Sequence, residues 1–149
     1  MENPRILLAD DQWQMIKAVT ALLERTFEIV AAVENGEQLI TADARHQPDI
    51  IVLDISMPVL NGIEAALRLR ESGSKAKVIF LTVHEDPDFV EAAFSAGALG
   101  YVLKQRLATD LVPAIREILQ NHVFVSPSVA IRAVSSSPHL LLQLERESV

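Results

Sequence analysis

The sequence predicts an α/β fold with a parallel sheet, and three observations lead to this prediction. Short apolar runs alternate along the chain with longer segments that have helical periodicity. The run Ile50–Leu53 is apolar at successive positions, which is typical of a strand covered on both faces in a parallel sheet. Hydrophobic residues make up 50% of the 149 residues, so the chain can form the core that such a sheet requires.

Five apolar segments are predicted as strands. Each is short, rich in aliphatic or β-branched residues, and bounded by turn-forming residues or by a change of periodicity. The predicted strands are Arg5–Ala9, Glu28–Val33, Ile50–Leu53, Lys77–Leu81 and Gly100–Leu103.

Five segments with apolar residues at helical spacing follow these strands and are predicted as helices. Pro113 has no N–H to donate, so we expect it in the first turn of the last helix, which should not begin much before Ala108. Alternation of strands and helices implies right-handed crossovers, with helices on both faces of the sheet. The predicted helices are Gln12–Phe27, Glu37–His46, Ile63–Glu71, a helix from Asp86-Pro87 to about Ser95, and Thr109–Asn121.

The composition argues against several classes of function. The net charge is −7 and the isoelectric point about 5.0, whereas a folded nucleic-acid-binding protein usually carries a basic face. The chain has no cysteine, which excludes disulfides, thiolate metal sites and a cysteine nucleophile. The N-terminal apolar segment is too short for a signal peptide or a membrane span. We therefore expect a soluble, cytoplasmic protein with no membrane partner.

Polar side chains follow four of the predicted strands at their carboxyl ends. Asp10 and Asp11 follow the first strand, Asp54 the third, Thr82 the fourth and Lys104 the fifth. The carboxyl ends of parallel strands meet at one edge of a sheet, where ligands bind in open α/β folds. We therefore expect these side chains to lie close together.

This set of side chains is suited to phosphoryl transfer assisted by a metal. Three neighbouring carboxylates repel one another, and Mg²⁺, which prefers oxygen ligands, would relieve that repulsion. A carboxylate such as Asp54 can act as a covalent acceptor, while Lys104 pairs with an acid or holds a phosphoryl oxygen. Taken singly, Asp10-Asp11 could be a helix cap, Thr82 a strand-end residue and Lys104 a solvated lysine. Their joint occurrence at four strand ends favours a functional site.

The sequence resembles the receiver domain of two-component response regulators over roughly Pro4 to Val125. It is most similar to the subfamily that carries a LuxR-type helix-turn-helix output. The resemblance implies a flavodoxin-like fold of five strands and five helices, with strand order 2-1-3-4-5. The motifs that carry it are Asp10-Asp11, Asp54 followed by Met57-Pro58 and Asn61-Gly62, Thr82 after an apolar strand, Gly97-Ala98 before Gly100-Tyr101, and Lys104.

The resemblance also implies a reaction and its ligands. Asp54 would accept a phosphoryl group from a phosphohistidine of a sensor histidine kinase. Mg²⁺ would be held by Asp11, Asp54 and the backbone carbonyl of Ser56, with Asp10 acting mainly through water. In this interpretation the chain is a phosphoacceptor signalling domain and not an enzyme.

The resemblance further implies a switch. Lys104 would contact the phosphoryl oxygen, Thr82 would follow it inward, and the aromatic Tyr101 would track that movement. The surface of the fourth helix, fifth strand and fifth helix would report the change to partners, a homodimer included. The residue after the lysine is Gln105, where many receivers have proline, so we expect a looser loop with no cis peptide.

The domain organisation expected is a receiver over residues 4–122 and a linker or tail over 123–149. Pro127 interrupts the tail, and Ser135–Pro138 has the composition of a linker. A helix-turn-helix domain would need several tens of further residues. The chain is therefore either a stand-alone receiver that acts by protein contacts or the N-terminal part of a transcription regulator. In the second case we expect DNA to be bound only by an output domain outside this chain.

Three other functions compete with the phosphoacceptor interpretation. An aspartate-nucleophile phosphatase of the haloacid-dehalogenase type would need a second Asp two residues after Asp54, where this chain has Ser56. A flavin-binding module, or a receiver fold kept only as a binding surface, would have the same architecture. Trp13 is expected to pack at the rim of the pocket and to change its fluorescence when Mg²⁺ and beryllofluoride are added.

Overall fold

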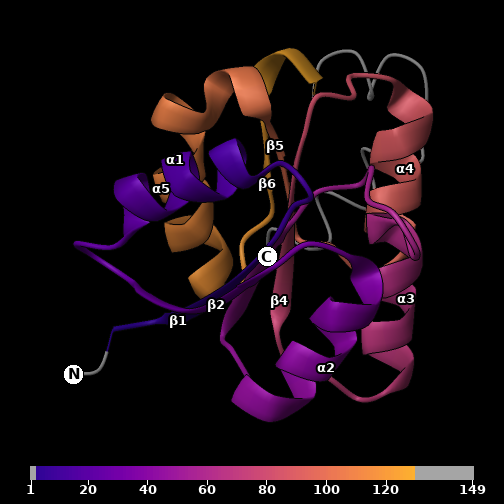
Figure 1. Cartoon of the computed structure of the whole chain (residues 1–149). Coiled ribbons are helices and arrows are strands. Elements are labelled where there is room, and N and C mark those ends of the chain that lie inside the picture. The colour runs from indigo at the N-terminus through magenta and orange to yellow at the C-terminus, as the bar shows by residue number, and fades with distance from the viewer. Residues whose placement is uncertain (1–2, 130–149) are drawn as a thin grey trace.

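A single parallel sheet with helices on both faces forms the centre of the molecule (Figure 1). The structure is a computed structural model, and it describes residues 3–129. The strand order is β2-β1-β3-β4-β5-β6, and every neighbouring pair is parallel. The predicted α/β class and the order 2-1-3-4-5 are confirmed, and a sixth strand extends the sheet beside β5.

The bounds of the elements agree with the predicted segments to within a few residues. The strands are β1 (Arg5–Ala9), β2 (Glu28–Val33), β3 (Ile50–Leu53), β4 (Lys77–Thr82), β5 (Gly100–Leu103) and β6 (Phe124–Val125). The helices are α1 (Trp13–Leu23), α2 (Gly36–His46), α3 (Gly62–Glu71), α4 (Pro87–Ser95), the 3₁₀ helix η1 (Lys104–Arg106) and α5 (Leu107–Leu119).

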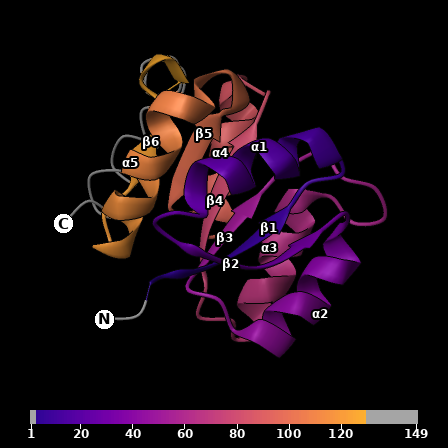
Figure 2. The same ribbon diagram turned by 60° about the vertical axis from the view of Figure 1, so that its left-hand side comes forward.

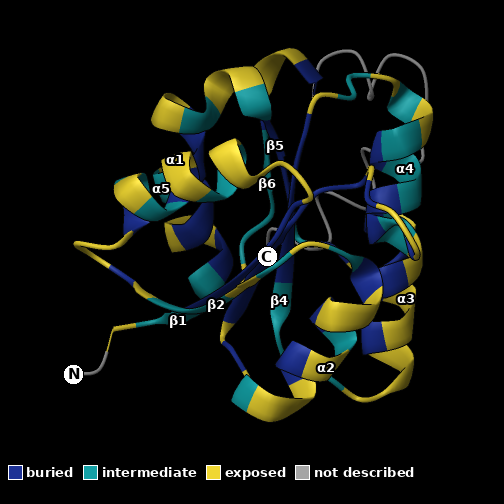
Figure 3. Ribbon diagram, in the orientation of Figure 1, coloured by how far each residue is buried: buried dark blue, intermediate teal, exposed yellow. Residues whose placement is uncertain are grey.

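The sheet separates two hydrophobic cores. Helices α1 and α5 cover one face, and α2, α3 and α4 cover the other (Figures 1 and 2). Along β3, Ile51 and Leu53 contribute to the α2–α4 core, whereas Ile50 and Val52 contribute to the α1–α5 core. This alternation explains why all four residues of β3 are buried, as the apolar run predicted. Figure 3 shows the same division, with buried strands and exposed outer helix surfaces.

Three helices begin at a side-chain cap. The side chains of Asn35, Asn61 and Asp86 accept a hydrogen bond from a backbone N–H in the first turns of α2, α3 and α4. Pro87 then occupies the first position of α4, where its missing N–H costs nothing. The Asn-Gly pairs of the sequence therefore mark helix starts at the ends of loops.

Pro113 does not lie where the sequence predicted it. Helix α5 begins at Leu107, so Pro113 is in the second turn and the prediction of a first-turn position was wrong. The start at Leu107 is one residue before Ala108 and agrees with the prediction; Pro113 falls beyond the first turn because a turn holds only about 3.6 residues. The buried face of α5 compensates for the hydrogen bond lost at proline; it consists of Asp110, Leu111, Ala114, Ile115 and Ile118.

The sheet continues beyond residue 122, where the expected linker begins. Strand β6 pairs with β5, and Val129 is 1% exposed. The remaining tail residues 130–149, which include the linker-like Ser135–Pro138, lie outside the described residues. No helix within residues 3–129 is both long and apolar enough to cross a bilayer.

Candidate functional site

The register of the sheet brings the predicted acids together. In the pairing of β1 with β3, Ala9 lies opposite Leu53, and the Asp54 N–H donates to the Ala9 carbonyl at 3.0 Å. The residues that follow each strand, Asp10 and Asp54, are therefore neighbours at the carboxyl edge. This is the convergence that the parallel arrangement predicted.

Three carboxylates form a cluster at this edge. Asp10, Asp11 and Asp54 each offer an oxygen, and these atoms lie within 4.8 Å of one another. Asp10 and Asp54 are both 5% exposed, whereas Asp11 is exposed to solvent. Asp10 also accepts a hydrogen bond from the Gln12 N–H at 2.9 Å, so it supports the start of α1 as well. The cluster thus combines two buried acids with one that faces solvent.

Lys104 joins the cluster from the end of β5. Its Nζ lies 2.9 Å from Asp10 Oδ2 and 3.1 Å from Asp54 Oδ2, and only 7% of the side chain is exposed. The same Nζ is 3.4 Å from Gln12 Oε1. Nothing in the sequence singles out Gln12, because polar residues are common at the start of a helix. One ammonium group therefore faces two buried carboxylates.

The surroundings of Asp54 and Lys104 raise the pKa of both side chains. Burial raises the pKa of Asp54, Lys104 opposes this by lowering it, and the charge of Asp10 raises it again, so the pKa ends above its usual value. Burial lowers the pKa of Lys104, but its contacts with Asp10 and Asp54 outweigh burial and raise it overall. Lys104 therefore stays charged beside an acid cluster that holds excess negative charge.

Thr82 and His84 line the loop that leaves β4. Thr82 is fully buried, and its Oγ1 accepts a hydrogen bond from the His84 N–H at 3.3 Å. The His84 ring lies 2.8 Å from Ser56 Oγ through Nε2 and stacks on Phe89 with centroids 4.2 Å apart. His84 thus ties the β4–α4 loop to the loop after Asp54. The sequence indicated neither the stacking nor this contact, because it depends on how two loops meet.

Tyr101 is buried in the sheet with its hydroxyl directed at the same loop. Its side chain is fully buried, and the hydroxyl donates to the His84 carbonyl at 2.8 Å. Burial, followed by the charges of Asp86 and Asp54, raises the pKa of Tyr101, so its hydroxyl stays protonated and remains a donor. The predicted switch residues Thr82 and Tyr101 therefore both contact His84.

The loop after Asp54 requires a glycine. Gly62 begins α3, and its N–H donates to the Ile55 carbonyl at 2.7 Å. A Cβ at this position would overlap the Asp54 carbonyl oxygen. Gly62 thus allows α3 to start directly against the backbone of Asp54.

Trp13 begins α1, as predicted, but it does not pack at the rim. It is 65% exposed, and Lys17 Nζ lies 5.2 Å from its ring centroid. Solvent rather than protein surrounds most of the ring.

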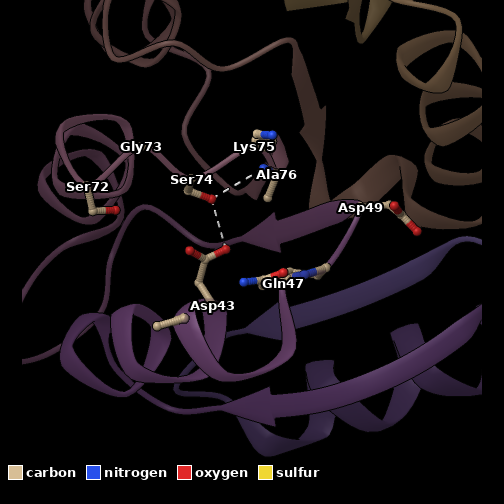
Figure 4. Close-up of a pocket in the computed structure, with 10 residues that line it drawn as sticks. Asp43, Gln47, Asp49, Ser72, Gly73, Ser74, Lys75 and Ala76 are labelled. Carbon is tan, nitrogen blue, oxygen red and sulfur yellow. Dashed lines mark hydrogen bonds between the residues drawn. The ribbon is translucent and has the colours of Figure 1, made fainter.

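A separate cavity of about 580 Å³ lies at the amino ends of the strands (Figure 4). Ser74 Oγ donates to Asp43 Oδ1 at 2.9 Å and accepts from the Ala76 N–H at 3.3 Å. Ligands in open parallel sheets bind at the carboxyl edge. This cavity and the acid cluster therefore lie at opposite edges of the sheet.

Comparison with known proteins agrees with this geometry. The chain matches the response regulator receiver domain over residues 6–116, which is more than half of its length. The chain belongs to the response regulator receiver domain family. It is the receiver domain of a two-component response regulator.

Its relatives include transcription regulators. The receiver is 32% identical over 146 residues to the transcriptional regulatory protein DegU of Brevibacillus brevis, covering 97% of this chain and 62% of the relative. It is 35% identical over 127 residues to the uncharacterized transcriptional regulatory protein YvfU of Bacillus subtilis (strain 168), covering 84% of this chain and 64% of the relative. The chain thus spans less than two thirds of each of these proteins.

A solved structure shows the same fold. The receiver superimposes with a TM-score of 0.86 on the crystal structure of a LuxR-family two-component response regulator from Aurantimonas sp. SI85-9A1. The two share 31% sequence identity, and the match covers 91% of this chain and 98% of that chain. The flavodoxin-like receiver fold and the LuxR-type subfamily expected from the sequence are both confirmed.

The acid cluster fits a magnesium ion. Receiver domains as a family bind Mg²⁺ at an acidic pocket, and this receiver presents three carboxylate oxygens close together, one on a solvent-exposed residue. Within residues 3–129, no other group of three or more potential ligating residues lies this close together. Oxygen-only donors are the ligands that Mg²⁺ prefers.

Proposed function

We propose that Asp54 is the phosphoacceptor of this receiver and that its donor is a phosphohistidine on a sensor histidine kinase. The observation that carries the proposal is the cluster of Asp10, Asp11 and Asp54, with Lys104 in contact with two of its members. A positioned carboxylate, a nearby cation and an oxygen-rich metal site are the parts that phosphoryl transfer uses.

In the proposed reaction a carboxylate oxygen of Asp54 forms a bond to phosphorus. The P–N bond of the phosphohistidine breaks, and the released imidazole nitrogen keeps the electron pair and takes a proton from solvent. Lys104 leaves its pairing with Asp54 and contacts an oxygen of the transferred group. The raised pKa of Lys104 keeps its ammonium group charged for this contact.

Asp11, Asp54 and the backbone carbonyl of Ser56 would hold Mg²⁺, with Asp10 contributing mainly through water. The ion would supply positive charge against the phosphoryl oxygens and the clustered carboxylates. The exposed position of Asp11 supports this assignment, because it leaves the cluster open to solvent.

We further propose that the modified site is read through Thr82 and Tyr101. Both side chains are buried and both contact the backbone of His84, so a shift of Thr82 toward the phosphoryl group would disturb the Tyr101 hydrogen bond. The face formed by α4, β5 and α5 would carry the change to partners, a second copy of the chain included.

At the level of the whole protein, we propose a cytoplasmic transcription regulator. The relatives DegU and YvfU are transcriptional regulatory proteins, and DNA binding would belong to an output domain outside this chain. We propose a receiver unit that starts at residue 4 and, because β6 pairs with β5, extends beyond the expected boundary at residue 122 before the tail begins. A stand-alone receiver that acts by protein contact is the alternative. In either case the chain transmits a signal and does not turn over a substrate.

Labelling with a small phosphodonor tests the assignment of Asp54. Acetyl phosphate with Mg²⁺ should add one phosphoryl group per chain, detected by intact mass, and chelation of Mg²⁺ should prevent it. The Asp54→Ala variant should remain unlabelled, whereas Glu24→Gln, which changes an exposed acid at the far end of α1, should label normally. An unlabelled wild type, or a labelled Asp54→Ala variant, would refute the proposal. Continuous release of phosphate from a phosphomonoester would indicate a phosphatase instead.

A further inference from the structure

Strand β6 fixes the start of the tail against the edge of β5. Gly100 lies opposite Phe124, Tyr101 lies opposite Val125, and the Ser126 N–H donates to the Tyr101 carbonyl at 2.9 Å. In Figure 1, β6 runs beside β5 at the end of the sheet. The tail thus pairs with the strand that carries Tyr101 and leads to Lys104.

The packing of this segment holds it in place on both faces of the sheet. Val123 and Val125 pack against the α2–α4 core, and Phe124 packs against the α1–α5 core. Val129 is buried in the α2–α4 core. The segment is therefore a structural part of the receiver as far as residue 129.

Ser126 lies at the centre of a buried polar network. Its side chain is fully buried; its Oγ accepts a hydrogen bond from the Leu103 N–H at 3.1 Å and donates to Asp110 Oδ2 at 2.8 Å. Asp110 also accepts from Arg106 Nε at 3.0 Å and Nη2 at 3.1 Å. The network thus holds Leu103, directly before Lys104, and through Asp110 it also holds Arg106 at the end of the turn.

This network stabilises a part of the chain that has Gln105 where many receivers have proline. Gln105 follows Lys104, and the segment Lys104–Arg106 forms the single turn η1 between β5 and α5. The looser loop expected from Gln105 is instead held by Ser126 and Asp110. Because Leu103 and Arg106 flank Lys104, these contacts restrict where the ammonium group can lie.

We propose that Ser126 is a positioning residue for Lys104 and that it couples the docking of β6 to the phosphoryl site. The inference rests on the proposed function of Asp54 and Lys104. When β6 is docked, the β5–α5 junction holds Lys104 where it contacts a phosphoryl group on Asp54. Such coupling is reciprocal, so occupation of the phosphoryl site must strengthen the docking of β6 by the same factor.

Beryllofluoride mimics the phosphoryl group. Its binding in the presence of Mg²⁺ tests whether Ser126 affects the phosphoryl site. Ser126→Ala should weaken beryllofluoride binding about three- to tenfold, because one buried hydrogen-bonding group is lost. Ser128→Ala removes an exposed hydroxyl two residues away and should bind like the wild type. Val30→Ala removes packing on β2 at the opposite edge, so it should lower stability without changing the affinity.

Amide hydrogen exchange of the wild-type chain tests the reciprocal half. Bound beryllofluoride should slow exchange of the Ser126 and Leu103 amides by a factor similar to the change in affinity expected for Ser126→Ala. Because it uses the wild type, this measurement tests the coupling even if Ser126→Ala does not fold. An unchanged affinity in Ser126→Ala, or unchanged exchange at Ser126 in the wild type, would overturn the inference alone. A wild type that binds no beryllofluoride would overturn both the inference and the proposed function.

Discussion

Lys104 and Asp10 shift the pKa of Asp54 in opposite directions. Burial is the largest influence on Asp54, and it acts with Asp10 to raise the pKa while Lys104 lowers it. The result is an acid cluster that one lysine neutralises only in part. This imbalance of charge favours the binding of a divalent cation at the cluster.

The contribution of Asp10 can be measured directly. Asp10→Asn removes a like charge and leaves Lys104 free to pair with Asp54 alone, so we expect the pKa of Asp54 to fall in the metal-free protein. A carboxyl ¹³C NMR titration measures this shift. Glu24→Gln should leave the Asp54 titration unchanged, and a rise in the pKa of Asp54 in Asp10→Asn would contradict the electrostatic account.

Gly62 and Gly73 are needed for different reasons: Gly62 because a Cβ would not fit, and Gly73 because of its backbone conformation. In Gly62→Ala the new Cβ would overlap the Asp54 carbonyl, so α3 or Asp54 must move. We expect the unfolding free energy to fall by about 1–3 kcal/mol, the usual cost of overpacking a core, and Mg²⁺ to bind more weakly. In Gly73→Ala the Cβ meets no atom within 4 Å, and only the φ of 82° opposes it, at a cost of about 1–2 kcal/mol.

Urea unfolding and Mg²⁺ titration of the two variants test this contrast. Gly73→Ala should keep the wild-type Mg²⁺ affinity despite its lower stability. Equal effects of the two substitutions on Mg²⁺ binding would show that the close approach at Gly62 does not shape the site.

At the scale of elements, the junction of β5, α5 and β6 is held by Asp110. Burial raises the pKa of this carboxyl, but hydrogen bonds from Arg106, Ser126 and Thr109 outweigh burial and lower it overall. An acid whose pKa is lower in the folded state than in the unfolded chain stabilises the fold above its unfolded pKa. That stabilisation disappears as the pH falls through the folded pKa.

Asp110→Asn should therefore cost stability at neutral pH and less in acid. We expect the variant to lose about 1–3 kcal/mol of unfolding free energy at neutral pH, the usual cost of disrupting a buried hydrogen-bonded group. Below the ordinary Asp value of 3.8 the difference from the wild type should shrink, because wild-type Asp110 becomes protonated as well. Urea unfolding at neutral pH and at about pH 3 measures both values. A difference that grows in acid would contradict the lowered pKa.

At the scale of the whole molecule, the sheet collects side chains from distant parts of the chain at one edge. Asp10, Asp54 and Lys104 are brought into contact by the pairing of β1 with β3 and by the position of β5 two strands away. Binding of an ion at this edge therefore depends on the folded sheet. A ligand that binds only the folded state stabilises that state.

Mg²⁺ should stabilise the receiver against urea through these carboxylates. At a concentration one hundred times the dissociation constant, the unfolding free energy should rise by about 2.7 kcal/mol. Asp11→Asn changes an exposed member of the cluster and should reduce this effect, while Glu24→Gln should retain it. Unfolding in MgCl₂ and in KCl of equal ionic strength separates specific binding from screening. Equal stabilisation of all three proteins would exclude the acid cluster as the Mg²⁺ site.

Much of the fold followed from local sequence patterns. The apolar run of β3 and Asp86-Pro87 gave the strand and the start of α4 correctly, because burial on both faces and capping depend on neighbouring residues. Pro113 was misplaced because the packing of the buried face of α5 tolerates a proline in the second turn, which the local rule for proline does not anticipate. Strand β6 was missed because two residues are too few for a periodic pattern.

The sequence by itself determined the parallel sheet and the acids, hydroxyl and lysine at its carboxyl edge, because strand direction places all of these ends together. Only the tertiary structure decided how they are connected. The contacts of Lys104 with two carboxylates, of His84 with Ser56, and of Ser126 with Asp110 join residues far apart in the chain. Such contacts depend on register and loop packing, which local propensity and hydrophobic periodicity do not specify.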